Sequence, residues 1–320
     1  MTAPTPAVTS LRPAWDDLPQ AVRDAITDHA GAPVAGATTQ TAGFSNGLAV
    51  RLVLADGRRL FVKGTPTDHV LHPRYAEEAA IGSVLTGRAP VPDLLRTWEV
   101  GGWLLMVIED VDGRHPDIRP DPDGPGTDTL LLLDLLAVLP RAVTPSPLPD
   151  APDFVDVVGE EFHGWARLRK DRVDIDPWAA RHLDALAGIE REWTKWAQGT
   201  TLVHADLRPD NILLTPTRSY VLDWAYLHQG APWIDPAVLF PHLLRAGHTA
   251  PAAEALMNEH VPTWRETPPE VLTSFAAAFT GYWERACRLP APPGVPYLRP
   301  FQKEMAGHGR RWIAHRTGWE

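Results

Sequence analysis

Four short runs rich in apolar residues lie within the first third of the chain, and the first two of them alternate with polar residues in the pattern of half-buried β-strands. Leu48–Leu54 and Arg59–Lys63 flank an Ala-Asp-Gly turn, and Leu94–Val100 and Trp103–Glu109 flank a pair of glycines. Short runs of this kind separated by Gly-containing turns are typical of β-hairpins. The sequence therefore predicts an antiparallel sheet built from two hairpins.

Helical periodicity surrounds these hairpins and dominates the chain after Asp110. Two helices are predicted in the first third, at Asp16–His29 and Arg74–Thr86. Later helices are predicted at Thr127–Leu139, Pro177–Trp196, Pro236–Arg245, Ala252–Glu259, Pro269–Cys287 and Tyr297–His315. Short strands are predicted at Thr201–Val203, Ile212–Leu214 and Tyr220–Leu222, and loops at the proline-rich stretches Pro116–Pro125 and Pro140–Pro152.

A sheet-rich segment followed by a larger helical one predicts the α+β class. We expect two lobes, residues 1–110 and residues 111–320, with a hinge at about residues 106–112. Ligands bind preferentially where two such lobes meet.

Composition narrows the range of partners. The chain has 320 residues, 44% of them apolar, and its net charge of -10 argues against a nucleic-acid partner, because a phosphate-binding surface needs clustered Lys and Arg. Its one cysteine, Cys287, excludes an intramolecular disulfide, and we find neither a signal peptide nor an apolar run long enough to span a membrane. We expect a cytoplasmic protein without nucleic-acid or membrane partners, and leave its oligomeric state open.

The most informative segment runs from His204 to Asp223. An apolar strand leads into His204-Ala205-Asp206-Leu207-Arg208-Pro209-Asp210-Asn211, and a later strand ends at Asp223. The step from Asp206 to Asn211 matches the kinase catalytic loop H-x-D-L-x-x-x-N, and Asp223 stands where a kinase has its metal-binding aspartate. A polar loop with ordinary turns and caps is the alternative interpretation.

Phosphoryl transfer needs few protein groups. One carboxylate must orient the attacking hydroxyl and accept its proton, and Asp206 fits that role. Hard oxygen ligands must hold Mg²⁺, and the Asn211 amide and the Asp223 carboxylate fit that role. We expect His204 to brace the loop through hydrogen bonds.

A kinase also needs a cation near the phosphates and a carboxylate that holds this cation. Lys63 ends an apolar strand, and the following predicted helix carries Glu77 and Glu78. We prefer Glu78 as the partner of Lys63 and keep Glu77 as the alternative. A lysine at a strand end is otherwise an ordinary edge charge.

Two further segments are candidates for nucleotide contacts. Gly43-Phe44-Ser45-Asn46-Gly47 precedes the first hairpin, and we expect its backbone N–H groups and Ser45 to cover phosphates, although a plain turn has the same composition. Glu109 to Val111 ends the last strand of the sheet, where backbone groups would meet a purine edge. ATP is the expected nucleotide, with GTP as the alternative.

These residues resemble the aminoglycoside phosphotransferase family. His204 to Leu213 is similar to its H-G-D-L-x-x-x-N-I-L run, with Ala205 in place of the usual glycine. Leu222-Asp223-Trp224, followed by Gly230, Pro232, Asp235 and Ala237, is similar to the next family motif. The resemblance covers most of the chain.

The resemblance implies a bilobal, protein-kinase-like fold. It also implies that Asp206 is the catalytic base, that Asn211 and Asp223 bind Mg²⁺ and that Lys63 contacts the nucleotide phosphates. Asp235 would be a structural acceptor that fixes the catalytic loop. The C-terminal sequence resembles actinobacterial members whose substrates are mostly unassigned.

Three functions compete on these grounds. The first is a kinase for a hydroxylated small molecule, with aminoglycosides and related antibiotics as candidate substrates. Acidic residues such as Asp156, Glu160 and Glu161 are candidates for binding a cationic substrate. For each of these acids, a position on a solvated helix face is the alternative interpretation. The second is a protein kinase, disfavoured because Ala205 replaces an arginine and no A-P-E sequence follows Asp223. The third is a catalytically silent nucleotide-binding module.

Overall fold

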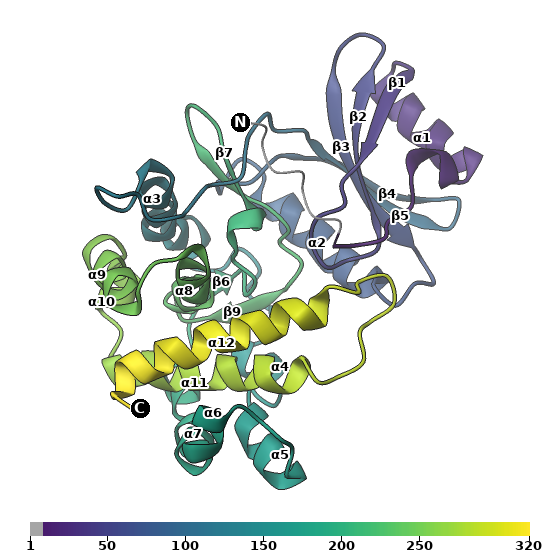
Figure 1. Ribbon diagram of the computed structural model, residues 1–320. Coiled ribbons are helices and arrows are strands. Elements are labelled where there is room, and N and C mark those ends of the chain that lie inside the picture. Colours follow the sequence, from purple (N-terminus) through teal and green to yellow (C-terminus); the bar gives the residue numbers. More distant parts are fainter. Residues whose placement is uncertain (1–8) are drawn as a thin grey trace. The chain divides into compact units, whose positions relative to one another are not determined.

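The computed structural model describes residues 9–320, and the chain divides into two compact units (Figure 1). The first, which we call the sheet unit, contains the described residues up to Gly113 together with Tyr220–Tyr226 and Ala291–Leu298. The second, the helical unit, contains Arg114–Ser219, Leu227–Pro290 and Arg299–Glu320. Two short segments from the second half of the sequence therefore belong to the sheet unit.

The sheet unit is built on a five-stranded antiparallel sheet in the order β1-β2-β3-β5-β4. Its strands are β1 (Val34–Thr39), β2 (Leu48–Leu54), β3 (Arg59–Pro66), β4 (Leu94–Val100) and β5 (Trp103–Glu109). The helices are α1 (Gln20–Ala30), preceded by the 3₁₀ turn η1 (Trp15–Asp17), and α2 (His72–Leu85). Both predicted hairpins are present.

The two helices of the sheet unit pack on opposite faces of the sheet. Val22 and Ile26 of α1 share a buried cluster with Val62, Leu105 and other strand residues. Tyr75 and Ala79 of α2 instead pack against Leu104 and Met106. Because successive side chains of a strand point to opposite faces, Lys63 lies on the α2 face when Val62 lies on the α1 face. The period of two along β3 thus directs Lys63 toward α2.

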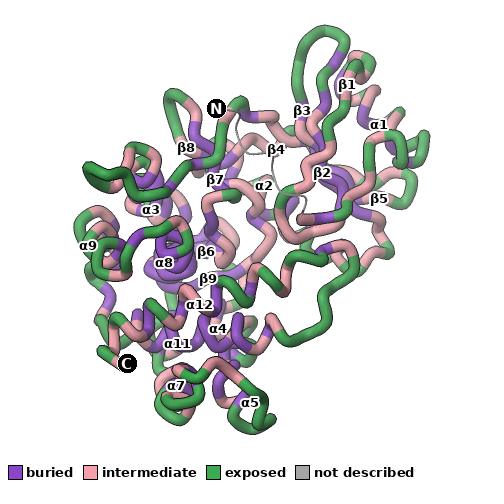
Figure 2. The backbone as a smooth tube through the Cα atoms, viewed as in Figure 1, coloured by how far each residue is buried: buried purple, intermediate pink, exposed green. Residues whose placement is uncertain are grey.

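The helical unit contains ten helices among its described residues, and α8 and α11 form its most buried part (Figure 2). Phe240 of α8 packs against Trp264 and Trp312, with ring centroids 5.0 and 4.5 Å away. The helices are α3 (Thr127–Val143), α4 (Phe154–Val158), α5 (Gly164–Asp171), α6 (Pro177–Arg181), α7 (Leu183–Ile189), α8 (Ile234–Ala246), α9 (Ala250–His260), α10 (Pro262–Arg265), α11 (Pro269–Ala286) and α12 (Leu298–Thr317). Across residues 9–320, no helix has both the length and the apolar character needed to cross a membrane.

The remaining elements are short and carry the polar loops. The 3₁₀ helices are η2 (Glu192–Trp196) and η3 (Pro209–Asn211), and the strands are β6 (Thr201–Val203), β7 (Ile212–Leu214), β8 (Ser219–Val221) and β9 (His228–Gly230). Strand β6 pairs antiparallel with β9. The loop from His204 to Asp210 therefore begins at a paired strand and ends at η3.

The structure differs from the sequence prediction in several places, and the short elements α4, α5, α10 and β9 were not predicted. Strand β1 was not predicted, because its small residues Val34–Thr39 lack clear alternation and pair with β2 only in the folded sheet. The predicted helix Pro177–Trp196 is three separate pieces, α6, α7 and η2. Pro140, expected in a loop, lies inside α3, where the buried stripe continues past it to Val143.

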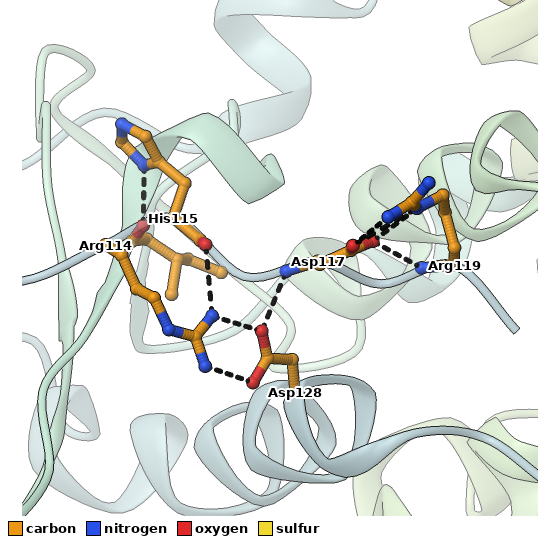
Figure 3. A network of polar contacts seen from close by, with 6 residues as sticks. Arg114, His115, Asp117, Arg119 and Asp128 are labelled. Atoms are coloured by element: carbon orange, nitrogen blue, oxygen red, sulfur yellow. Dashed lines mark hydrogen bonds and ion pairs between the residues drawn. The ribbon is translucent and has the colours of Figure 1, made fainter. Parts of the chain in front are cut away.

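A polar network fastens the first residues of the helical unit (Figure 3). Arg114 bonds both carboxylate oxygens of Asp128 at the start of α3, and that carboxylate also accepts the backbone N–H of Asp117 at 2.9 Å. His115 Nδ1 lies 2.9 Å from the carbonyl oxygen of Ile212 in β7. The segment after Gly113 is thereby fixed to the strand that follows Asn211.

A buried carboxylate caps α5. Glu190 is 0% exposed and accepts the backbone N–H groups of Trp165 and Ala166 at 3.0 and 2.9 Å. Burial raises the pKa of Glu190 to about 7, and the two hydrogen bonds only partly oppose it. The folded protein therefore holds this proton more tightly than the unfolded chain does.

We expect the free energy of unfolding to contain a Glu190 contribution that is fully present at about pH 4.5 and is lost as the pH rises to about 7. Urea denaturation of the wild type and of Glu190→Gln at several pH values measures it. The wild type should lose stability relative to the variant across this window, and the difference should then stay constant. Parallel profiles from pH 5 to 8 would show that Glu190 titrates normally.

Candidate active site

Lys63 is the centre of an ionic cluster in the sheet unit. Its Nζ donates to both carboxylate oxygens of Glu78, at 2.5 and 2.7 Å, and to Oδ1 of Asp223 at 2.7 Å. Glu78, rather than Glu77, thus pairs with Lys63. Both side chains are 10% exposed, whereas the Asp223 side chain is 39% exposed. Asp223 is therefore the member of the cluster that is most accessible to solvent.

Two neighbouring carboxylates keep the Lys63 side chain protonated. Burial by itself would lower the pKa of Lys63, because it disfavours the ammonium form. The carboxylates of Asp223 and Glu78 outweigh this effect and raise the pKa above its ordinary value. Lys63 therefore remains a cation at neutral pH and is suited to contact phosphate oxygens.

Asp223 reaches this cluster through the segment Tyr220–Tyr226. The backbone N–H of Val221 donates to the carbonyl oxygen of Pro90 at 2.7 Å, which ties the segment to the sheet unit. Asp223 itself has a φ of 62°, in the left-handed region that non-glycine residues seldom adopt. Such strain is concentrated at functional positions, where the surrounding structure holds it.

The second polar centre lies in the helical unit, in the loop after β6. The Asp206 side chain is 39% exposed, and its backbone N–H lies 3.3 Å from His204 Nδ1. Nδ2 of Asn211 donates to the carbonyl oxygen of Asp206 at 2.9 Å and lies 3.4 Å from Oδ2 of the same residue. Asp206 and Asn211 are therefore locked together across one turn of the loop, with the Asp206 carboxylate accessible.

Asp235 holds the beginning of this loop from α8. Its carboxylate accepts the backbone N–H groups of His204 and Ala205, each at 2.9 Å. Burial raises the pKa of Asp235, while His204 and the two hydrogen bonds oppose the change. The prediction that Asp235 is a structural acceptor for the loop is confirmed by these bonds.

Sequence reasoning missed an ion pair inside the loop. Nε and Nη2 of Arg208 bond the two carboxylate oxygens of Asp210 at 3.0 and 2.6 Å, and Nε lies 4.0 Å from Oδ1 of Asp206. The Arg208 guanidinium also lies 5.6 Å from the Phe301 ring centroid, over its face. Opposite charges two residues apart were visible in the sequence, but the burial of Arg208 was not.

Two other candidate segments lie in the sheet unit. Ser45 is half-buried in the loop Gly43–Gly47, between β1 and β2. Glu109 ends β5, where its carboxylate accepts the backbone N–H of Asp93 at 3.2 Å, and Val111 is buried and accepts the Gly113 N–H at 3.0 Å. The structure places these residues without assigning them a ligand.

The acidic candidates for substrate binding are exposed. Asp156 lies on α4, and Glu160 and Glu161 follow it. Glu160 pairs with Arg167 at 3.1 Å, and at 83% exposure that pair is a solvated surface contact. This arrangement favours the solvated-face interpretation for Glu160.

The donor chemistry of the two centres suits a magnesium nucleotide. Asn211 directs its amide nitrogen at Asp206, which leaves its amide oxygen as the group to offer a cation. Asp223 offers carboxylate oxygen, so both proposed ligands are the hard oxygen donors that Mg²⁺ takes. The cluster of Lys63, Glu78 and Asp223 carries a formal charge of -1, which a bound divalent cation would offset.

Comparison with known proteins gives a family. The model described as the phosphotransferase enzyme family matches residues 39–269. No curated protein matches the sequence.

Solved structures resemble the whole chain. The complex of amicoumacin kinase hAmiN with AMP-PNP, Ca²⁺ and Ami has a TM-score of 0.57 at 14% identity, covering 92% of this chain and 93% of the other. Spectinomycin phosphotransferase APH(9)-Ia with ADP and spectinomycin has 0.61 at 10%, covering 94% and 98%. Macrolide 2'-phosphotransferase MphH from Brachybacterium faecium has 0.56 at 16%, covering 93% and 98%. These likenesses confirm the predicted α+β, protein-kinase-like fold.

Ala205 has a φ of 62°, so the position that resembles a family glycine is strained by its Cβ. Glycine relieves this strain but loses more conformational entropy on folding than alanine does. Because the relief of strain should be the larger free-energy contribution, we expect Ala205→Gly to stabilise the fold by about 0.5 kcal/mol. Ala255→Gly, an exposed position within α9, is the matched control and should cost about 1 kcal/mol. Urea unfolding midpoints measure both, and equal losses in the two variants would contradict strain at Ala205.

Proposed function

The chain belongs to the phosphotransferase enzyme family, and from that premise we propose that it transfers the terminal phosphoryl group of ATP to a hydroxyl group of a small molecule. One observation carries the proposal. Lys63 and Asp223, 160 residues apart in sequence, meet at 2.7 Å, with Glu78 holding the lysine from α2. A buried lysine held by a helix glutamate and touching a strained, partly exposed aspartate is the arrangement that binds a metal-complexed polyphosphate.

The proposed roles follow from the contacts. Asp206 orients the acceptor hydroxyl and takes its proton as the acceptor oxygen bonds to phosphorus and the bond to the bridging oxygen of ATP breaks. Lys63 contacts phosphate oxygens as a fixed cation. Mg²⁺, when bound through Asn211 and Asp223, supplies charge neutralisation at the phosphates. Asp235 and Arg208 keep the loop that carries Asp206 in one conformation.

We also propose the division of labour expected from the sequence. Residues 1–110 form the nucleotide-binding lobe, with Ser45, Glu109 and Val111 among its contacts, and residues 111–320 form the catalytic and acceptor-binding lobe. The three solved relatives named above are described as acting on or binding amicoumacin, spectinomycin or a macrolide. Hydroxylated antibiotics, including cationic aminoglycosides, are therefore the first acceptors to test.

The function is tested by incubating the protein with Mg²⁺ and ATP, or GTP, and a panel of aminoglycosides, macrolides, peptide antibiotics and amino alcohols. Mass spectrometry should detect one phosphorylated class of acceptor. With that acceptor, Asp206→Ala should lower kcat by about 10²–10⁴-fold because the proton acceptor is lost. Asp184→Ala, an exposed aspartate of α7, is the matched control and should retain activity.

Two results would contradict this assignment. Unchanged transfer by Asp206→Ala would exclude Asp206 as the base. Nucleotide binding by the wild type without any phosphorylated product across the panel would favour the catalytically silent module.

Asp223 is tested by nucleotide binding rather than turnover. We expect the wild type to bind AMP-PNP more tightly with Mg²⁺ than with EDTA, because Asp223 would hold the cation that accompanies the phosphates. Asp223→Ala should bind equally in both conditions, whereas Asp28→Ala, which removes an exposed carboxylate on α1 of the sheet unit, should behave as the wild type. Isothermal titration calorimetry measures both affinities. A Mg²⁺ dependence that survives in Asp223→Ala would overturn the metal role.

A further inference from the structure

The segment Thr9–Arg12, which we call the strap, runs along the loop Gly43–Gly47. The backbone N–H groups of Thr9 and Ser10 donate to the carbonyl oxygen of Thr41 at 3.0 and 3.1 Å. Their hydroxyl groups both donate to the carbonyl oxygen of Gly43, at 2.7 and 2.6 Å. Two consecutive residues thus bond Thr41, just before the loop, through their main chain, and Gly43, its first residue, through their side chains.

Arg12 reaches across the loop to both of its ends. Nη2 donates to the carbonyl oxygen of Ala42 at 3.0 Å, and Nη1 donates to that of Gly47 at 3.2 Å. The guanidinium is a planar fork, so the two bonds fix the separation of the two carbonyl groups. Residues 44–46 form the span between these fastened ends.

The far end of the loop is packed against the helix that carries Glu78. A Cβ on Gly47 would lie 2.1 Å from the Tyr75 hydroxyl oxygen and 2.8 Å from the carbonyl oxygen of Gly64, so only glycine fits there. The Nζ of Lys63 lies 5.6 Å from the centroid of the same Tyr75 ring. The end of the loop that Arg12 fastens is therefore next to the residues that surround Lys63.

The strap also contacts the segment Ala291–Leu298, which belongs to the same unit. The backbone N–H of Leu11 donates to the carbonyl oxygen of Gly294 at 2.9 Å. A Cβ on Gly294 would lie 2.9 Å from Cβ of Asn46, so this segment also contacts the span of the loop. The loop is thereby enclosed between the strap and a piece of chain from between α11 and α12.

We propose that Arg12 is a positioning residue of the nucleotide site, whose fork fastens both ends of the loop Gly43–Gly47 and presets the loop for the phosphates. This inference rests on the proposed function, since it assumes that the loop covers a nucleotide. A loop ordered before binding loses less conformational entropy when the ligand arrives, so the preset loop binds more tightly. The expected ligand of the loop is the polyphosphate of the nucleotide rather than its base.

Arg12→Gln tests the proposal, and Arg58→Gln is the matched control because Arg58 also donates to a backbone carbonyl, that of Ala30, in the same unit. Calorimetry measures the Kd of AMP-PNP with Mg²⁺ and the Kd of adenosine. We expect Arg12→Gln to weaken AMP-PNP about tenfold, which corresponds to about 1.4 kcal/mol, and to leave adenosine unchanged. Arg58→Gln should leave both constants unchanged.

Arg12→Lys separates geometry from charge. Lysine keeps the charge but lacks the planar fork, so it should lose as much AMP-PNP affinity as glutamine does. Full affinity in Arg12→Lys would overturn the proposal in favour of a simple electrostatic role. An equal loss for adenosine in Arg12→Gln would also overturn it, because it would indicate general damage to the site.

Hydrogen exchange of the nucleotide-free protein gives a second measurement. Amides of residues 43–47 should exchange faster in Arg12→Gln than in the wild type and at unchanged rates in Arg58→Gln. Equal exchange in all three proteins would overturn the fastening of the loop. A wild type that binds no AMP-PNP would instead refute the proposed function and with it the nucleotide role of Arg12, while the exchange result still decides whether Arg12 holds the loop.

Discussion

The ammonium group of Lys63 lies between the carboxylates of Glu78 and Asp223. This contact joins strand β3, helix α2 and the segment Tyr220–Tyr226 within the sheet unit. Removing three charges from water is expensive, and their mutual attraction repays the cost only with good geometry and hydrogen bonds. The antiparallel register places Lys63 opposite Met106, on the face covered by α2, and α2 supplies Glu78 from a buried position. The cluster has a formal net charge of -1 and leaves the Asp223 carboxylate partly exposed, as the proposed metal role of Asp223 requires.

The loop in the helical unit holds Asp206 in one conformation and leaves its carboxylate partly exposed. Asp235 accepts the backbone N–H groups of His204 and Ala205, and Asn211 donates to the backbone carbonyl of Asp206. The ion pair of Arg208 and Asp210 lies within the same loop and adds no net charge to it. The left-handed backbone at Ala205 is the conformational cost of this geometry, and the Asp235 hydrogen bonds offset it.

Arginine recurs where irregular backbone needs a donor. Several guanidinium groups bond backbone carbonyl groups in loops or at helix ends: Arg12 at Ala42 and Gly47, Arg58 at Ala30, Arg299 at Pro290 and Arg316 at Pro269. Five N–H donors on one planar group let a single side chain fasten two distant points, which explains how short loops of this protein are fixed without strands.

The sequence by itself determined the features that depend on neighbouring residues. Short apolar runs beside Gly-containing turns, as at Leu48–Leu54 and Trp103–Glu109, identified strands, and the spacing from Asp206 to Asn211 identified the polar loop, because turn chemistry and strand pleat act over a few residues. Only the tertiary structure decided between Glu77 and Glu78, brought Asp223 to Lys63 and placed Arg12 across the glycine loop. Those contacts join residues 15, 160 and 35 positions apart, and such separations are set by the packing of sheet, helix and linker rather than by any local period.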